Sequence, residues 1–251
     1  MVRTSLCSSP CRSPPAERCP TDGTLLPPEA VDGDSSPAAL RVEAMFPLGT
    51  VLFPSGLLPL QVFEPRYRAM LADLLAGERR FGVVLIERGS EVGGGEVRSG
   101  IGTLARIVEA RPAVDGRWSV AAVGLRRIRV HRWLPDDPYP RAEVEDLPDT
   151  SPAGPADTEA YPELVGRLRR VLARLSELGE PVAPSTFEAA EEPALGTYQL
   201  AALGPFGSYD RQRVLEATSV ASRLTLLARL LAEVSEDVDR RLAGGGPGQR
   251  R

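Results

Sequence analysis

The chain has 251 residues, of which 42% are apolar and 25% are charged, and its formal net charge is −4. These values are typical of a globular protein of one or two domains, and they disfavour a protein whose main task is to neutralise nucleic-acid phosphates. The sequence has no lysine, no asparagine and a single histidine, His131. Because these 251 residues include no lysine, they cannot form a lysine-dependent phosphate loop, a lysine Schiff base or a serine–lysine catalytic dyad.

Residues 1–40 are rich in proline, serine, glycine and aspartate and carry few large apolar side chains. Such a segment buries too little surface to offset the entropy of ordering, so we expect a disordered extension, or a translation start at Met45 instead of Met1. Its cysteines, at positions 7, 11 and 19, provide neither a paired disulfide framework nor a zinc site. No apolar run resembles a signal peptide or a membrane span, so we expect a cytoplasmic protein without a membrane partner.

The next segment is the most apolar of the chain, yet prolines interrupt it. Proline removes a backbone donor and fixes φ, so Pro47, Pro54 and Pro59 predict short extended pieces joined by turns. Pro65 precedes apolar residues at helical spacing and is well placed as the first residue of a helix that ends at Gly77. We therefore expect one helix inserted among strands.

Short apolar runs bounded by glycine, proline or aspartate continue to about residue 147 and predict strands. The expected strands are Phe81–Ile86, Ile101–Ala110, Trp118–Gly124, Arg126–Leu134 and Tyr139–Leu147. Val92–Gly95 breaks the pattern, and Asp115-Gly116 is a strong signal for a hairpin turn. Residues 41–148 are thus expected to form a small β-barrel or sandwich.

The period of the apolar residues changes to about 3.6 after a linker expected at residues 149–156. The expected helices are Tyr161–Leu178, Ala194–Leu203, Asp210–Glu216 and Val220–Val238. Pro181 and Pro184 are expected to end the first of them. These elements give a helical subdomain at 157–241, a flexible tail at 242–251 and an α+β fold class.

Several segments, in order, resemble the amino-terminal substrate-binding domain of the Lon protease family. They include FPLGTVLFPSGLLPLQVFEPRYRAML, SGIGTLARI and YQLAALGPF, and the most specific is F-E-P-R-Y at Phe63–Tyr67. The resemblance implies a PUA-like β-pseudobarrel with one inserted helix, followed by a C-terminal helical bundle. It also implies recognition of unfolded or damaged polypeptides.

This sequence encodes neither the ATPase nor the peptidase module that follows the domain in Lon proteases. We therefore expect a non-enzymatic polypeptide-binding module in protein quality control, without cofactor or metal. Its expected partners are unfolded or extended polypeptide segments and, beyond them, a protease or chaperone. Nucleic acid is an unfavoured partner.

The segment around the inserted helix supplies the candidate binding residues. They are Leu58, Leu60, Phe63, Glu64, Arg66 and Tyr67. The leucines and Phe63 would line a peptide groove, and the helix entrance would present a charged pair and an aromatic edge. The alternative is structural, because leucines and Tyr67 commonly pack in a core and Glu64 favours a helix N-terminus electrostatically.

An arginine-rich strand gives the alternative of RNA binding, through Arg127, Arg129 and His131. The favoured interpretation is a solvated strand face paired with its neighbour. The expected cross-strand pairs are Arg129 with Glu145, His131 with Glu143 and Trp133 with Arg141.

A third hypothesis, a small-ligand domain, rests on Gly100–Ala105, which fits the dinucleotide fingerprint GxGxxA. That fingerprint needs a helix directly after the strand, whereas here the strand pattern continues. We favour glycines that allow a bend or bulge in a curved strand.

Overall fold

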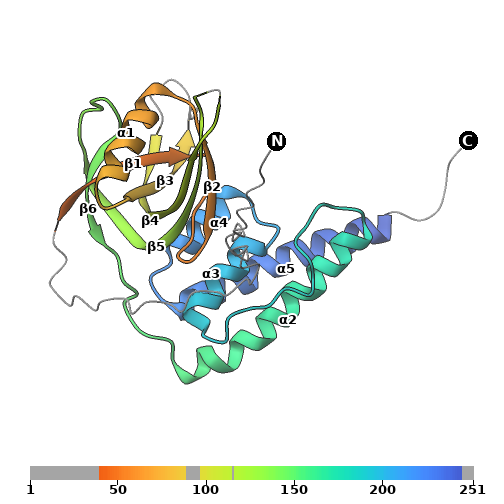
Figure 1. Cartoon of the computed structure of the whole chain (residues 1–251). Coiled ribbons are helices and arrows are strands. Elements are labelled where there is room, and N and C mark those ends of the chain that lie inside the picture. Colours follow the sequence, from red (N-terminus) through yellow and green to blue (C-terminus); the bar gives the residue numbers. More distant parts are fainter. Residues whose placement is uncertain (1–39, 89–96, 115, 245–251) are drawn as a thin grey trace, which may run out of the picture. The chain divides into compact units, whose positions relative to one another are not determined.

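Six strands and five helices make up the described part of the chain (Figure 1). The computed structural model describes residues 40–88, 97–114 and 116–244. The strands are β1 Arg41–Leu48, β2 Leu57–Val62, β3 Arg80–Arg88, β4 Val97–Pro112, β5 Trp118–Trp133 and β6 Arg141–Asp146, and the helices are α1 Pro65–Ala76, α2 Pro155–Glu177, α3 Pro193–Leu203, α4 Ser208–Glu216 and α5 Val220–Gly244. The expected disorder of 1–40 (Leu40 apart), the break at Val92–Gly95 and residues 245–251 of the expected tail lie outside the described residues.

The strands pair in the order β2-β5-β4-β3-β1-β6, and β6 also pairs with β5. The pairings of β1, β3, β4, β5 and β6 therefore close into a ring. β5 is long enough for two neighbours on one edge, because its first half pairs with β2 and its second half with β6. The strands expected at Trp118–Gly124 and Arg126–Leu134 are thus one continuous strand.

Two prolines lie within strands, where the sequence predicted boundaries. Pro47 is in β1 and pairs with Val84 of β3, and Pro59 is in the middle of β2. Pro59 is tolerated because β2 pairs on one side only among the residues that the structure describes, and an edge strand has backbone groups that need no partner strand. Pro54 lies in a turn, and Pro65 opens α1, as predicted.

Glycines let neighbouring backbones approach closely. A Cβ on Gly102 would lie 2.2 Å from the carbonyl oxygen of Val83, far inside van der Waals contact. β4 continues through Gly100–Ala105 as far as Pro112, and its pairing with β5 shifts register after Leu104. The helix that a dinucleotide site requires does not follow, so that interpretation is wrong and the one based on a bulged strand holds.

Separate apolar clusters lie on the two sides of the strands. α1 covers one side, where Tyr67 stacks on Phe46 with ring centroids 4.1 Å apart. The cluster on the other side consists of Met45, Val84, Leu104, Ile128, Ala142 and Val144. Because β1, β3, β4 and β5 contribute to both clusters, their sequences are apolar on both faces.

The helices α2 to α5 share a third cluster, in which Leu168, Leu172 and Leu227 are completely buried. Phe53, from the loop before β2, packs into the same cluster. α2 ends at Glu177, and Gly179, with φ of 79°, turns the chain before the prolines expected to end it. α2 starts inside the expected linker and α5 runs beyond 241 to Gly244, so both predicted helix boundaries are displaced.

Candidate functional site

The strand β2 presents an open edge. Among the described residues its only paired neighbour is β5, from Leu57 opposite Val123 to Val62 opposite Trp118. Leu58 and Val62 point into the core below α1, whereas Leu57 is 67% exposed. An edge strand with unpaired backbone groups and an exposed leucine can accept another extended segment.

The residues between β2 and α1 hold the helix entrance in place. Pro65 occupies the first helical turn after Glu64, and the Glu64 carboxylate accepts a hydrogen bond of 3.0 Å from Nε of Arg66. The guanidinium of Arg66 lies 4.6 Å from the ring centroid of Tyr67, which is buried. Phe63 differs from these residues, because 56% of it is exposed.

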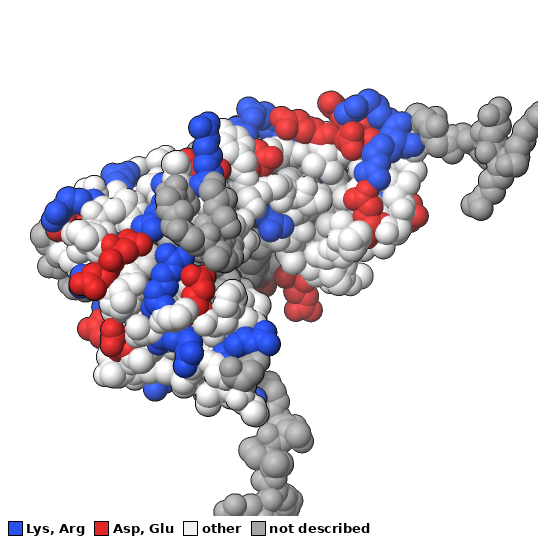
Figure 2. Space-filling model, turned by 90° about the horizontal axis from the view of Figure 1, so that it is seen from above, with Lys and Arg blue, Asp and Glu red and all other residues white. Residues whose placement is uncertain are grey.

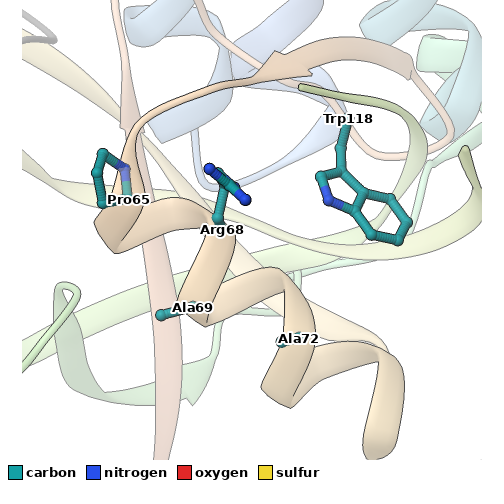
Figure 3. Close-up of a pocket in the computed structure, with 5 residues that line it drawn as sticks. All are labelled: Pro65, Arg68, Ala69, Ala72 and Trp118. Atoms are coloured by element: carbon teal, nitrogen blue, oxygen red, sulfur yellow. The ribbon is translucent and has the colours of Figure 1, made fainter. Parts of the chain in front are cut away.

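A pocket of about 410 Å³ opens beside this entrance. Its lining consists of Pro65, Arg68, Ala69, Ala72 and Trp118. Four of these residues come from α1, and Trp118 comes from the first position of β5, directly opposite the end of β2 (Figure 3). The alanines leave room because they recur on one helix face at i, i+3 spacing.

The structure separates the predicted binding residues into two groups. Leu58 and Tyr67 are buried, Leu60 lines a narrow apolar space under α1, and Glu64 pairs with Arg66. Of the six predicted residues, only Phe63 is a large apolar side chain exposed to solvent. Sequence reasoning missed Arg68 and Trp118. Arg68 could have been found from its helical spacing to Pro65, but Trp118 lies too far along the chain for any local pattern to place it.

Arg127 does not belong to a solvated strand face. It is 3% exposed and points toward the helices, where its Nη1 donates to the carbonyl oxygens of Leu215 and Ala217 at 2.9 and 2.6 Å. Its Nη2 donates to the Asp149 carboxylate at 2.7 Å. The same carboxylate binds the fully buried Arg223 with both oxygens, at 2.8 and 2.7 Å. Arg127 is therefore part of a buried ion network and is not free to bind RNA.

The remaining basic residues of this strand are paired with β6. Arg129 lies opposite Glu145, as expected, with 3.5 Å between Nη1 and Oε1. The other two expected pairs are wrong, because the register shifts between Val130 and Arg132. Arg132 is opposite Glu143, Trp133 is opposite Ala142, and Nε2 of His131 lies 3.0 Å from the Glu145 carboxylate. A bulge that the sequence did not signal moved the later residues by one position.

Acidic residues of β6 also neutralise arginines of the neighbouring strands β1 and β5. Burial opposes ionisation of Asp146, but hydrogen bonds from Arg126 and Arg41 outweigh it, so the pKa of this carboxyl lies below its ordinary value. On Glu143, the hydrogen bond from Arg132 lowers the pKa. Figure 2 shows basic and acidic residues interleaved on the face it draws. Such a surface does not provide the continuous basic stripe typical of nucleic-acid binding.

The described residues contain neither a cluster of metal-ligating side chains nor a helix that could span a membrane. In the described ranges, no three His, Cys, Asp or Glu side chains come together in a group that could ligate a metal ion. None of the helices there is both long and apolar enough to cross a membrane.

Comparison with known proteins identifies the family. The model of the ATP-dependent protease La (LON) substrate-binding domain matches residues 44–233. The chain belongs to this family. The resemblance based on the F-E-P-R-Y segment is therefore confirmed. The matched residues extend from within β1 to within α5, so the family model covers the strands as well as the helices.

Relatives and solved structures agree with this assignment. The chain is 28% identical to the Lon protease of Anaeromyxobacter dehalogenans over 82% of its own length and 24% of that protein. For Lon protease 2 of Myxococcus xanthus the identity is 28%, over 82% of this chain and 25% of that protein. The chain thus spans about a quarter of the length of these proteases.

Two solved domains show the same fold. The Lon N-terminal domain protein from Xanthomonas campestris is 28% identical, with a TM-score of 0.55 over 75% of this chain and 98% of that one. The N-terminal domain of the Mycobacterium avium complex Lon protease gives a TM-score of 0.58 at 16% identity, over 76% and 98%. At that identity the second likeness concerns the fold alone.

Proposed function

We propose that this chain is a polypeptide-binding module that captures exposed, extended segments of other proteins at the open edge of β2. The observation that carries the proposal is that edge, with Leu57 and Phe63 exposed at its two ends. Membership of the LON substrate-binding domain family supports it. A bound segment would add its backbone hydrogen bonds to β2 and lay apolar side chains against these two residues.

The finer parts of the assignment belong to the same proposal. The closed strand pairing with α1 inserted supports a PUA-like pseudobarrel at 41–148, and the shared core of α2 to α5 supports a helical bundle at 157–241. The module acts by binding and not by catalysis. It works in cytoplasmic protein quality control and passes clients to a protease or chaperone.

A titration tests the proposal. The full chain is added to a fluorescently labelled, permanently unfolded polypeptide, and anisotropy is followed, with a single-stranded RNA in a parallel cell. We expect saturable, micromolar binding to the polypeptide, little weakened by salt, because the contacts are apolar and backbone in nature. Phe63→Asp and Leu57→Asp should each weaken it at least fivefold, since each places a charge against the bound segment.

The control variant is Tyr209→Asp, because Tyr209 is an exposed aromatic residue on α4 and not on β2. It should bind as the unmodified chain does. Absence of binding to the polypeptide at high micromolar concentration would rule the proposal out. Steep, salt-dependent binding to RNA alone would replace it by nucleic-acid recognition.

A further inference from the structure

The pocket between α1 and Trp118 contains two hydrogen-bond donors that face each other. Arg68 extends from α1 into the space between Pro65 and Trp118, and the indole nitrogen of Trp118 lies on the side of its ring toward Arg68 (Figure 3). The rest of the lining is proline and alanine, which offer no side-chain acceptor. The site therefore combines an apolar wall with two donors and no acceptor among its lining side chains.

No described side chain accepts a hydrogen bond from the Arg68 guanidinium or the Trp118 indole N–H. The acidic residues on and next to α1 are already engaged, because Glu64 pairs with Arg66 and Asp73 accepts a hydrogen bond of 2.8 Å from the Tyr139 hydroxyl. Within the described part of the chain, the Arg68 guanidinium has no ion pair and the Trp118 indole has no hydrogen-bond acceptor. A ligand that carries an anionic acceptor would complement both.

We propose that this pocket is a subsite for the client polypeptide that recognises an acidic side chain. It binds an aromatic or large aliphatic side chain of the client together with a neighbouring aspartate or glutamate. The apolar side chain packs on Trp118 and the alanines, and the carboxylate accepts hydrogen bonds from Arg68 and the indole N–H. A volume of about 410 Å³ is at the lower end of ligand pockets, enough for side chains of a segment and not for a folded domain. The inference rests on the proposed function, because the client reaches the pocket along β2, whose last residue pairs with Trp118.

The carboxylate that the pocket binds belongs to a side chain of the client polypeptide and not to the client's C-terminus. Terminal carboxylates are captured by clustered backbone N–H groups. In this lining, Pro65 has no N–H, the N–H of Arg68 donates to the Glu64 carbonyl, and Ala69 and Ala72 lie inside the helix, where their N–H groups are used. A planar guanidinium binds a side-chain carboxylate without such a cluster.

The test uses four extended peptides of equal length without tryptophan. One has Phe-Asp at its centre, and the others have Phe-Asn, Ala-Asp and a C-terminal Phe. Trp118 reports occupation of the pocket when the chain's other tryptophan is replaced, so Trp133→Phe is the background and Trp118 fluorescence the readout. We expect the Phe-Asp peptide to bind about tenfold more tightly than Phe-Asn, because a charge-assisted hydrogen bond is lost with the amide.

Arg68→Gln should remove this preference and leave binding of Phe-Asn unchanged. The matched control is Arg170→Gln, an exposed arginine of α2 without an ion pair in the described residues, and it should keep the tenfold preference. The preference should also shrink with salt, since Arg68 is exposed to solvent.

Equal binding of Phe-Asp and Phe-Asn would overturn the subsite and leave the proposed function standing, because the polypeptide still binds. Tighter binding of the C-terminal Phe peptide than of Phe-Asp would overturn the choice of a side-chain carboxylate. If none of the peptides binds and the unfolded polypeptide also fails, the proposed function itself is wrong.

Discussion

Arg127 lies in a run of basic residues on β5. The direction of its side chain determines whether these residues form one solvent-exposed basic face. Alternation along the strand predicted that Arg127, Arg129 and His131 share a solvated face. In the structure Arg129 and His131 bind Glu145 near the surface, while Arg127 is buried against the helices. Strand alternation cannot show that a helix packs on part of a face, because the helix that covers Arg127 comes almost 90 residues later.

Arg127→Ala should destabilise the chain by about 3 kcal/mol, because it leaves the Leu215 and Ala217 carbonyls without a donor and removes a cation from a buried network. The measurement is equilibrium unfolding in urea. Arg129→Ala is the control, and it should cost less than about 1 kcal/mol because its ion pair is exposed. Equal effects of the two variants would show that the network around Arg127 contributes no more than a surface pair.

At the scale of elements, the sequence predicted helices better than strands. The periods of α2 and α5 could be read from the sequence because each of these long helices has one apolar stripe that recurs every three or four residues. Strand limits were harder, since β1 and β3 are apolar on both faces and Pro47 and Pro59 sit inside strands. The β5–β6 register failed after Val130, where one bulge moved two predicted pairs. In the candidate site, Phe63 was predicted, but the Trp118 side of the pocket depends on how distant strands pair.

The close approach of β3 and β4 at Gly102 gives a prediction at this scale. Gly102→Ala should destabilise the chain by at least about 2 kcal/mol, because the added Cβ would lie 2.2 Å from the Val83 carbonyl oxygen and the backbones must separate. Gly100→Ala is the matched control, since a Cβ there meets nothing within 4 Å. Thermal unfolding of the two variants checks this, and a Gly102→Ala protein as stable as Gly100→Ala would contradict it.

At the scale of the molecule, one carboxylate connects the strand and helix cores. Asp149 follows β6 and binds Arg127 of β5 and Arg223 of α5 together, and Arg223 also lies 4.3 Å from the ring centroid of Tyr198 on α3. Two buried cations share one anion. Backbone carbonyls accept the other hydrogen bonds of Arg127, and the Thr197 hydroxyl accepts one from Nε of Arg223. The first residue of the linker expected at 149–156 is thus held in place by two buried ion pairs. Since both arginines depend on it, Asp149 couples the elements more than any surface pair does.

Asp149→Ala should therefore change how the chain unfolds as well as how stable it is. Both arginines would be left buried without a counter-charge, at a cost of about 3–5 kcal/mol, and separating the helices from the strands would relieve that cost while the apolar clusters of each part persist. Trp118 and Trp133 lie in β5, so their fluorescence follows the strands, whereas far-ultraviolet circular dichroism follows the helices. The unmodified chain should give coincident urea transitions by the two probes, because its described residues belong to one compact unit.

In Asp149→Ala the circular dichroism transition should move to lower urea than the fluorescence transition. Asp137→Ala is the control, because it removes an exposed carboxylate that makes no ion pair in the described residues, and it should leave the two transitions coincident. If the Asp149→Ala transitions shift together, the carboxylate adds stability without setting cooperativity. In that case the apolar contacts of Phe53 with the helical cluster are what join the two parts.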